Sequence, residues 1–395
     1  MNKKTLKDIN VSDKKVIVRV DFNVPLEDGK VTDDNRIKAA LPTIKYLINE
    51  DAYVILMSHL GRPKGEVDES LRLDPVADRL ADLLGQEVKK VDNCIGEEPK
   101  KAIKQMDKGD VLLLENTRFH KGEKENDPEF SKQLSEIADI FVLDAFGAAH
   151  RAHASTVGVG EYLPSAAGFL LQREVQALSE VMENPEHPFV AVMGGAKVSD
   201  KMEVIRNLYD KVDYLITGGG IANTFIRAQG HETGESLVEE DKIDLAKDLM
   251  AEAEQKGVEL VFPVDVYIAD EFSENANCKM VNIDEIPADW QVLDCGGEKS
   301  LKKYKEIIDK AKTVIWNGPL GVFEFEKFEI GTKTMAEFLA NCEGKTVVGG
   351  GESAAATIKY GVADKMDHVS TGGGASLQFF EGKPLPAVEA LDALN

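Results

Sequence analysis

The sequence predicts an α/β protein made of two doubly wound domains, each with a parallel sheet. The first observation is the length of 395 residues, which exceeds what one ordinary hydrophobic core supports. The second is the alternation of short β-branched runs with helical periodicity in both halves of the chain. The third is a long helical pattern near the middle that ends in a proline-bearing segment, where a domain junction is expected.

Composition indicates a soluble globular protein, with 43% hydrophobic and 30% charged residues. The formal net charge of -23 disfavours nucleic acid and anionic membranes as partners. No apolar run reaches the ~18 residues of a membrane span, and the first residues lack the apolar core of a signal peptide. The four cysteines have no metal-binding spacing, so reduced thiols and a cytoplasmic location are expected.

The first half of the chain shows strand-like runs separated by helical patterns. Runs rich in valine, isoleucine and leucine predict strands at residues 15–20, 53–57, 111–114 and 140–143. Apolar residues at helical spacing predict helices at residues 37–50, 73–84 and 129–138. Strands that alternate with helices form βαβ units, so we expect a parallel sheet that is buried on both faces.

The second half repeats this pattern. Strands are predicted at residues 189–193, 214–217, 258–262, 313–316, 346–348 and 368–370. Between the halves, residues 169–182 have helical periodicity, and Pro185 and Pro188 end that helix. We therefore expect a first domain at residues 1–168, an interdomain helix and hinge at 169–187, and a second domain at 188–379.

Basic side chains follow the predicted strands of the first half. Arg36 lies in the loop before the first helix, and Arg62, Arg118 and Arg151 follow the second, third and fourth strands. Open parallel sheets bind ligands at the carboxyl ends of their strands, so these arginines are expected to converge. Such a group holds a small carboxylate or phosphate through bidentate hydrogen bonds. The alternative is a set of surface or interdomain salt bridges.

Histidines stand beside two of these arginines. His59 and His150 either donate to the same anion or serve as structural hydrogen-bonding groups. His120 and His153 are expected to be structural. Metal binding by this group is not expected, because the arginines would repel a cation.

Glycine pairs and triplets occupy the corresponding positions of the second half. They lie at residues 194–195, 218–220, 296–297, 349–351 and 372–374. Glycine lets backbone amides approach a phosphate or a flat base closely, although a single pair more often marks a turn. Residues 347–353 give the clearest pattern of strand, glycine loop and helix start, with Ser353 as a possible helix cap.

Residues 193–201 carry two lysines after a glycine turn. Lys197 and Lys201 are four apart, and this spacing is expected to place both ammonium groups on one helix face near its N-terminus. Free backbone N–H groups and the positive end of the helix dipole would complete an anion site.

Polar side chains in two of the later loops suggest further ligand contacts. Glu352 would repel a bound phosphate unless a cation intervened, so we expect Mg²⁺ to bridge Glu352 and phosphate oxygens. The alternative is that Glu352 only favours the helix N-terminus electrostatically. Asn317 and Glu324 lie among turn residues, and Glu324 either accepts hydrogen bonds from a ribose or is simply solvated.

Two phosphate-binding regions on separate domains predict phosphoryl transfer, with the active site in the cleft between the domains. Neither a Walker A nor a G-x-G-x-x-G sequence follows a strand, which disfavours a P-loop NTPase and the usual NAD enzyme. No residue set is spaced for a covalent intermediate, so direct in-line transfer is expected. The main alternative is a non-catalytic phospho-metabolite or nucleotide binding protein, which has no evident need for cations from both domains.

Six motifs resemble those of phosphoglycerate kinases, in order and at family spacing. They are RVDFNVP at 19–25, SHLGRP at 58–63, ENTRF at 115–119, GGAKV at 194–198, WNGP at 316–319 and GGG at 349–351. The resemblance spans essentially the whole chain. It implies reversible transfer of the acyl phosphate of 1,3-bisphosphoglycerate to ADP, giving 3-phosphoglycerate and ATP, in glycolysis. It also implies a monomer with two Rossmann-like domains, in which a tail at about residues 380–395 packs on the first domain.

The resemblance assigns site residues as well. The expected phosphoglycerate-binding residues are Asp21, Phe22, Asn23, Arg36, His59, Leu60, Gly61, Arg62, Arg118 and Arg151. The expected nucleotide-binding residues are Gly195, Lys201, Gly218, Gly219, Asn317, Glu324, Gly350, Gly351, Glu352 and Ser353. The expected catalytic groups are Arg36, Lys197, Lys201 and Gly351, and Glu352 is the expected ligand of Mg²⁺.

Two positions depart from the family pattern. The glycine loop usually continues with Asp, and here it continues with Glu352, whose extra methylene must be absorbed by a shift of the metal or the loop. Ala148 stands where the family usually has Thr, so a hydroxyl contact is absent there.

Overall fold

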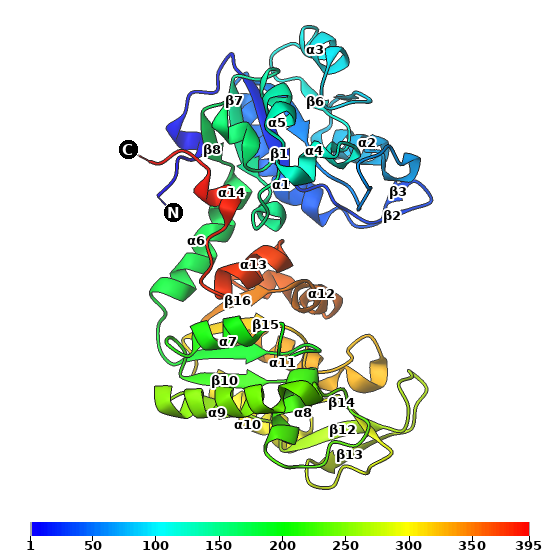
Figure 1. Cartoon of the computed structure of the whole chain (residues 1–395), viewed down its shortest axis with the longest axis vertical. Helices are drawn as coiled ribbons and strands as arrows, with labels where there is room; N and C mark the ends of the chain where they lie inside the picture. The colour runs from blue at the N-terminus through cyan, green and yellow to red at the C-terminus, as the bar shows by residue number, and fades with distance from the viewer. Residues whose placement is uncertain (1, 395) are drawn as a thin grey trace. The chain divides into compact units, whose positions relative to one another are not determined.

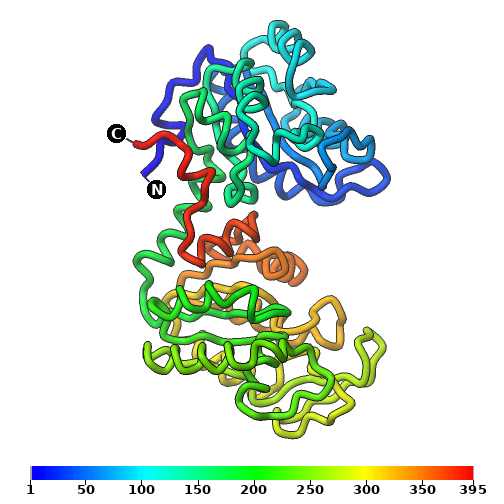
Figure 2. The backbone as a smooth tube through the Cα atoms, in the orientation of Figure 1, coloured from blue at the N-terminus to red at the C-terminus, as the bar shows by residue number. Residues whose placement is uncertain are grey.

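The chain forms two compact α/β units in the computed structural model, which describes residues 2–394 (Figures 1 and 2). Unit 1 comprises Met1–Gln176 and Pro384–Asn395, and unit 2 comprises Ala177–Lys383. The division falls inside helix α6 (Phe169–Glu183), the helix predicted at residues 169–182. The predicted α/β class with two parallel-sheet domains is confirmed.

Within the described residues, unit 1 is built around a six-stranded sheet in the order β5-β6-β4-β1-β7-β8, with every pairing parallel. Its strands are β1 (Lys15–Val20), β4 (Tyr53–Met57), β5 (Val88–Lys90), β6 (Val111–Leu113), β7 (Ile140–Asp144) and β8 (Ser165–Ala167). The four predicted strands form its centre. The edge strands β5 and β8 were not predicted, because three residues each of Val-Lys-Lys and Ser-Ala-Ala give no β-branched pattern.

The helices of unit 1 include the three that helical periodicity predicts, with ends that differ from the prediction by at most three residues. These are α1 (Asn35–Asn49), α2 (Asp74–Leu84) and α5 (Pro128–Ser135). Shorter helices are α3 (Glu97–Ile103), α4 (Gly122–Glu125) and α14 (Pro386–Glu389), and a small hairpin pairs β2 (Leu26–Glu27) with β3 (Lys30–Val31). The buried faces of α1 and α2 pack with β1 and β4 in one hydrophobic core.

Unit 2, all of whose residues are described, contains a second parallel sheet in the order β11-β10-β9-β15-β16-β17. Its strands are β9 (Phe189–Met193), β10 (Tyr214–Thr217), β11 (Glu259–Val261), β15 (Thr313–Asn317), β16 (Lys345–Gly349) and β17 (His368–Val369). All six were predicted, with ends that differ by at most one residue. Every residue of β9 and β15 is buried, as expected for a sheet covered on both faces.

A three-stranded antiparallel sheet was not predicted from the sequence. It consists of β12 (Asp265–Ala269), β13 (Cys278–Asn282) and β14 (Gln291–Asp294), in the order β13-β12-β14, and it lies beside α8 (Gly219–Ala228) in Figure 1. The polar sequence of β13 is largely exposed, which hides the alternation that identifies strands.

The remaining helices of unit 2 follow or connect the parallel strands. They are α7 (Met202–Leu208), α9 (Ile243–Lys256), α10 (Glu298–Ile308), α11 (Ile330–Ala340), α12 (Gly351–Lys359) and α13 (Gly373–Phe380). No helix among residues 2–394 combines the length and apolarity needed to cross a membrane.

Strand order fixes one switch point in each sheet. In unit 1 this point lies between the neighbouring strands β1 and β7, because β4, β5 and β6 lie on the β1 side and β8 lies on the β7 side. In unit 2 it lies between β9 and β15. Ligands bind doubly wound sheets beyond the carboxyl ends of the strands that flank such a point. The residues after Val20 and Asp144 in unit 1, and after Met193 and Asn317 in unit 2, therefore mark the places to look for a site.

The two terminal segments lie side by side in unit 1 (Figure 2). Lys3 forms a bridge with Ala393, and the backbone N–H of Lys4 donates to the carbonyl of Asp392 at 2.9 Å. The Asp392 N–H donates to the hydroxyl of Ser165, at the start of β8, at 2.9 Å. Thr5 forms a parallel bridge with Ala167 of β8, so the N-terminal segment extends the edge of the unit 1 sheet and the end of the chain pairs with that segment.

Asp144 is a fully buried carboxylate that caps α6. Its Oδ1 accepts hydrogen bonds from the N–H groups of Leu170 at 2.9 Å and Leu171 at 3.2 Å. Burial raises the pKa of Asp144 to about 7, although hydrogen bonds from Thr43 and from these two amides act in the opposite direction. The protonated carboxyl is therefore favoured in the folded chain more than in the unfolded chain.

We predict that Asp144→Asn removes a pH-dependent loss of stability. Because its pKa is raised on folding, the wild-type carboxyl stabilises the fold at low pH and loses this contribution as the pH rises towards 7. In the pH range where only the folded form holds the proton, the free energy of unfolding falls by about 1.4 kcal/mol per pH unit. Denaturant unfolding from pH 5 to 8 should show the variant gaining on the wild type as pH rises. The exposed Asp107→Asn is the control, and a difference independent of pH would contradict the assignment.

Candidate functional site

Arginines from separate segments of unit 1 converge on one histidine. Burial lowers the pKa of His59 well below its usual range, and four guanidinium groups lower it further. These groups belong to Arg19, Arg118, Arg36 and Arg151. We call these four arginines and His59 the arginine cluster. Arg36, Arg118 and Arg151 therefore all act on the same imidazole, and their convergence on one anion stays a prediction.

Arg36 is tied to the segment that follows β1. Its Nη1 contacts Asp21 Oδ1 at 3.3 Å and donates to the carbonyl of Asn23 at 3.0 Å. The expectation that Arg36 precedes the first helix is wrong, because α1 begins at Asn35 and Arg36 lies in its first turn. The helix starts earlier because the carbonyl of Asp34 already accepts from Lys38, and the Asp34 carboxylate pairs with the same lysine.

The loops after β1 and β4 are joined by side-chain to backbone hydrogen bonds. Asn23 Oδ1 accepts from the N–H of Gly61 at 2.8 Å, and Arg118 Nη1 donates to the carbonyl of Gly61 at 2.7 Å. The side chains of Phe22 and Leu60 are buried in the core. Asn23, Gly61 and Arg118 thus lie together, while Phe22 and Leu60 contribute mainly packing beneath them.

Arg19 is a member of the cluster that sequence reasoning missed. It is fully buried on β1, and it donates to Ser155 Oγ at 2.7 Å and to His59 Nδ1 at 2.9 Å. Ser155 in turn donates to the buried carboxylate of Glu123 at 2.6 Å. Because Nδ1 of the neutral His59 accepts, its proton sits on Nε2 and is free to donate. The available signal was a charged residue inside an otherwise apolar strand.

The remaining arginines differ in exposure. Arg118 is buried, its Nε has no hydrogen-bond partner within the described chain, and burial and then Arg19 and Arg151 lower its pKa to about 10. Arg151 is exposed and its Nε donates to His150 Nε2 at 3.0 Å. Arg62 is exposed and makes no hydrogen bond or ion pair with the described residues, so its predicted convergence has no contact to support it.

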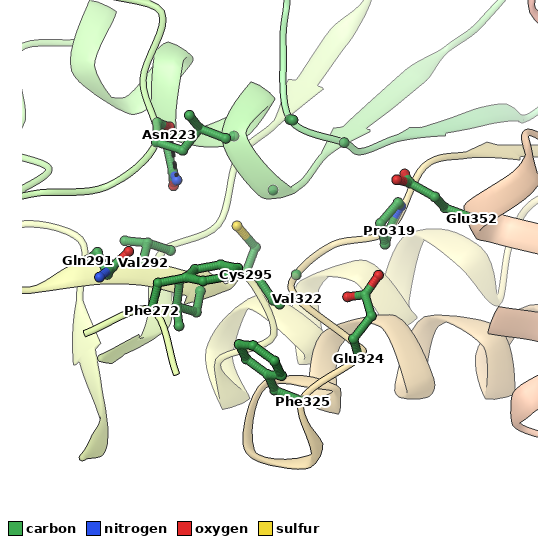
Figure 3. Close-up of a pocket in the computed structure, with 17 residues that line it drawn as sticks. Asn223, Phe272, Gln291, Val292, Cys295, Pro319, Val322, Glu324, Phe325 and Glu352 are labelled. Carbon is green, nitrogen blue, oxygen red and sulfur yellow. Dashed lines mark hydrogen bonds between the residues drawn. The ribbon is translucent and has the colours of Figure 1, made fainter. Parts of the chain in front are cut away.

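Unit 2 contains a cavity of about 430 Å³ at the carboxyl ends of β9, β10 and β15 (Figure 3). Its wall combines glycine backbone, apolar side chains and two acids. The lining residues that the sequence predicted are Gly195, Gly219, Glu324 and Glu352. The cavity has the size of a small-molecule site.

Glycine turns bring two strand ends into close contact beside this cavity. The N–H of Gly194 donates to the carbonyl of Asn317 at 3.0 Å, and that of Gly195 donates to Pro319 at 3.1 Å. A Cβ atom on Gly194 would lie 1.9 Å from the carbonyl oxygen of Pro319, so no larger residue fits. The N–H of Gly218, which caps α8, is bonded to Met193 at 3.0 Å, and the turns after β9, β10 and β15 form one connected rim.

The prediction that Lys197 and Lys201 share a helix face is wrong. α7 begins at Met202, Lys201 is its N-cap residue, and Lys197 lies in the irregular segment before it. Ser199 interrupts the helical pattern because its N–H and hydroxyl both donate to Glu239, at 2.9 and 2.5 Å. Lys197 is exposed and Lys201 is half-buried.

Lys201 has a perturbed ammonium group. Burial lowers the pKa of Lys201 to about 8, and the carboxylates of Glu352 and Asp200 oppose this effect. Because Glu352 lies in the first turn of α12 and affects the pKa of Lys201, the segment that carries Lys201 lies near the start of that helix. A phosphate bound between them would meet both a cation and an anion, and this suits a site that also holds a metal ion.

The loop between β16 and α12 differs from the prediction at Ser353. α12 begins at Gly351 with Gly350 as its N-cap, so Ser353 lies inside the helix and is not the cap. Its hydroxyl accepts the N–H of Gly318 at 2.5 Å, which fixes the turn after β15. Gly350 has a positive φ of 95°, which only glycine adopts readily, and this leaves the first amides of α12 at the loop.

Asn317 lies at the end of β15 and is buried, yet both atoms of its side-chain amide lack hydrogen-bond partners among the described residues. A buried unpaired amide costs about 1–3 kcal/mol, so the Asn317 amide, which lies next to Gly350, is a group for which a partner is expected.

Apolar lining residues were missed from the sequence. They are Leu237, Phe272, Val292, Val322 and Phe325. Leu237 and Phe272 are 55% and 64% exposed, and two neighbouring phenylalanine rings, Phe272 and Phe325, stand 5.3 Å apart. An exposed large apolar residue is itself a sign of a binding surface, but the sequence does not show exposure.

The two sites define the class of protein. Unit 1 offers clustered guanidinium groups for a small anion, and unit 2 offers glycine amides, a lysine and carboxylates around a cavity of the size of a small molecule. No group of three or more His, Cys, Asp or Glu residues within 2–394 forms a ready-made metal site. These are the parts of an enzyme that moves a phosphoryl group between two small substrates.

Comparison with known proteins identifies the family. The family model described as phosphoglycerate kinase matches residues 6–383. A phosphoglycerate kinase of Moorella thermoacetica is 57% identical over 391 residues, which cover 99% of each chain. Solved phosphoglycerate kinases from Coxiella burnetii and Pyrococcus horikoshii superpose with TM-scores of 0.90 and 0.87 at 44% and 35% identity, covering 98% of each chain.

The chain therefore belongs to the phosphoglycerate kinase family. It is a kinase of glycolysis that transfers the acyl phosphate of 1,3-bisphosphoglycerate to ADP, reversibly. The resemblance read from the six motifs is confirmed, and the alternative of a non-catalytic binding protein is not supported.

We predict that Lys201 loses its proton near pH 8 in the free protein, and that Glu352→Gln lowers this pKa further by removing the carboxylate that favours the ammonium form. Labelling by an amine-reactive reagent, followed by mass spectrometry across pH 6 to 11, measures the titration. Lys383, whose pKa is raised by Glu203 and Glu381, is the internal control. Labelling of Lys201 and Lys383 with the same pH dependence would contradict the assignment.

Proposed function

We propose that the arginine cluster binds the phosphoglycerate substrate. The observation that carries this proposal is the concentration of four guanidinium groups around one neutral, buried histidine. So many positive charges need an anion close by. A molecule with a carboxylate or acyl phosphate at one end and a phosphate at the other matches several bidentate donors at once.

Each proposed phosphoglycerate-binding residue has a distinct role. Arg118 Nε has no hydrogen-bond partner among the described residues, and the hydrogen bond from Arg19 leaves the His59 proton on Nε2. Arg36 is held by Asp21 and Asn23. Phe22, Leu60 and Gly61 shape the loops that carry these side chains. Arg62 and Arg151, which are exposed, are proposed to reach the substrate when it is present.

We propose that the unit 2 cavity binds the nucleotide. The flat apolar walls suit a base, Glu324 suits the hydroxyl groups of a ribose, and the glycine turns suit phosphates. The nucleotide residues of this proposal are Gly195, Lys201, Gly218, Gly219, Asn317, Glu324, Gly350, Gly351, Glu352 and Ser353. For Ser353 the role is indirect, since its hydroxyl already binds Gly318.

We propose direct in-line transfer without a covalent enzyme intermediate. Arg36, Lys197, Lys201 and the amide of Gly351 would stabilise the charge on the transferring phosphoryl group. Transfer requires that the two substrates meet, so we propose that two domains close about a hinge during the reaction. The first domain is residues 1–168 with the tail at about 380–395, the second is residues 188–379, and the helix and hinge are residues 169–187. Lys197, which is exposed on a loop, is suited to complete its contacts only then.

We propose that Mg²⁺ accompanies the nucleotide and that Glu352 holds it. Mg²⁺ in nucleotide sites is bound by one or two carboxylates together with phosphate oxygens, so a single acid beside Lys201 fits this need. When bound, the ion neutralises phosphate charge. Glu352 would hold the ion, and Lys201 would pair with phosphate oxygens.

We also propose that the protein acts as a monomer in the cytoplasm, with small molecules as its only partners. Nucleotides and phosphorylated metabolites are intracellular compounds, and the strongly negative net charge of -23 keeps copies of the chain apart. Light scattering after size-exclusion chromatography tests the oligomeric state, and a mass twice that of the chain would contradict it.

A coupled assay with ATP, Mg²⁺ and 3-phosphoglycerate tests the proposed roles. Arg36→Ala removes a cation from the transferring phosphoryl group, and kcat is expected to fall more than about 10²-fold. Arg227→Ala, which removes an arginine that pairs with Glu232 in unit 2, is the matched control and should leave kcat unchanged. A loss confined to KM would show that Arg36 only binds substrate.

Glu352→Gln tests the metal role. The amide has no charge to offset that of the ion, so half-saturation by Mg²⁺ should move to a higher concentration both in turnover and in binding of ADP measured calorimetrically at a series of Mg²⁺ concentrations. Glu326→Gln, in a short turn outside the lining of the cavity, is the control. An unchanged Mg²⁺ dependence of ADP binding rejects the role.

A further inference from the structure

Glu239 binds the segment that carries Lys197 and Lys201. Its carboxylate accepts two hydrogen bonds from Ser199, one from the backbone N–H at 2.9 Å and one from the hydroxyl at 2.5 Å. Ser199 stands midway between the two lysines in the sequence. Because one carboxylate meets two donors of the same residue, the contact fixes both the distance and the direction of the backbone at this point.

The segment is irregular and depends on such contacts for its position. Residues 194–201, which we call the lysine segment, belong to no helix or strand. Near its start, the N–H and the carbonyl of Gly195 are bonded to the turn after β15 and to α8, at 3.1 and 3.2 Å. Further along, the side chain of Val198 is buried, while that of Lys197 is exposed. The backbone at Lys197 is therefore held by Gly195 before it and by Val198 and Ser199 after it.

Glu239 is itself anchored to the wall of the unit 2 cavity. Its backbone N–H donates to the hydroxyl of Thr224 at 3.2 Å, and that hydroxyl donates to the carbonyl of Gly220 at 2.9 Å. Thr224 is fully buried on α8, and Gly220 lines the cavity. A Cβ atom on Gly220 would lie 2.2 Å from the carbonyl oxygen of Ala196, so the lysine segment packs on the same helix. Glu239 thus connects Ser199 to the cavity wall.

The contacts of Glu239 indicate a geometric role. The carboxylates that act on the pKa of Lys201 are those of Glu352 and Asp200. Glu239 lies outside the lining of the cavity, and both of its carboxylate oxygens are engaged by Ser199. It therefore acts on the lysines through the place where it holds Ser199.

We propose that Glu239 is a positioning residue for phosphoryl transfer, which holds Ser199 so that Lys197 and Lys201 reach the transferring phosphoryl group. The inference rests on the proposed roles of the two lysines and adds the contact that sets their place. Cations stabilise a transition state only where they are held in position, and a misplacement of about 1 Å costs up to about 10²-fold in rate. A half-buried acid outside the cavity thereby controls kcat.

Two substitutions of Glu239 separate its reach from its charge. Glu239→Gln keeps the length of the side chain, and its Oε1 accepts the Ser199 N–H while its Nε2 donates to the hydroxyl. Glu239→Asp keeps the charge but is one methylene shorter. In the assay with ATP, Mg²⁺ and 3-phosphoglycerate, kcat is expected to stay within about threefold of wild type in Glu239→Gln and to fall more than about tenfold in Glu239→Asp.

The kinetic constants of both variants decide the proposal. KM for 3-phosphoglycerate, which is proposed to bind in unit 1, should change less than about twofold in either variant, because only groups of unit 2 are displaced. Equal kcat in the two variants, or a larger loss of kcat in Glu239→Gln, overturns the proposal. A loss confined to KM for ATP overturns it as well, since it shows that Glu239 affects binding alone.

Asp367→Ala is the matched control. One oxygen of Asp367 accepts both the N–H and the hydroxyl of Thr346, at 2.8 and 3.1 Å, near the start of β16 and outside the lining of the cavity. This variant loses the same pair of contacts, so its thermal unfolding midpoint should fall while kcat stays within about twofold of wild type. A fall in kcat as large as that in Glu239→Asp would assign the effect to any lost contact of unit 2 and overturn the proposal.

Lys197→Ala separates this inference from the function on which it rests. Unchanged kcat in Lys197→Ala contradicts the role of the lysine itself, and the inference falls with it. Lowered kcat in Lys197→Ala together with equal kcat in the two Glu239 variants leaves the lysine role intact and removes only that of Glu239. If Glu239→Asp does not fold, Ser199→Ala, which deletes the hydroxyl and keeps the N–H, takes its place, and unchanged kcat in it overturns the proposal.

Discussion

The parallel hydrogen-bonded ladder is the constraint on which both sites depend. Parallel strands all end at one edge of their sheet, so residues far apart in the sequence arrive together without long connecting loops. In unit 1 this edge gathers Arg19, His59 and Arg118, and in unit 2 it joins the turn at Gly194 to that at Pro319. The chemistry of each unit is then set by the residue types placed just after the strands.

The buried cations of the arginine cluster in unit 1 need neighbouring groups that compensate their charge. A guanidinium as buried as that of Arg19 is costly unless its hydrogen bonds and charge are matched. Ser155 and Glu123 supply this, since Arg19 donates to the Ser155 hydroxyl, which donates to the Glu123 carboxylate. Burial and then the charge of Arg19 lower the pKa of His59, and the hydrogen bond from Arg19 to Nδ1 leaves the proton of the neutral imidazole on Nε2. A buried carboxylate thus helps to orient the histidine that we propose to contact the substrate.

The sequence predicted the central strands of both sheets because apolar runs of four or more residues report burial on two faces. It did not predict β8 or β13, whose short or polar strands carry no such pattern. At the site, arginines after strands were predictable from strand order alone. The helix assigned to Lys197 was wrong, because the Ser199–Glu239 contact that breaks it joins segments distant in sequence. The expected cap role of Ser353 is wrong for the same reason, since its partner Gly318 follows another strand.

Unpaired buried polar atoms stand at both sites. Arg118 Nε belongs to the arginine cluster, and Asn317 and Asn223 lie beside the glycine turns of unit 2; none of these atoms has a partner among residues 2–394. Each such group costs about 1–3 kcal/mol in the empty protein. Under the proposed function, a substrate that pairs with such an atom would remove this cost, and the relief of the cost would add to its binding free energy.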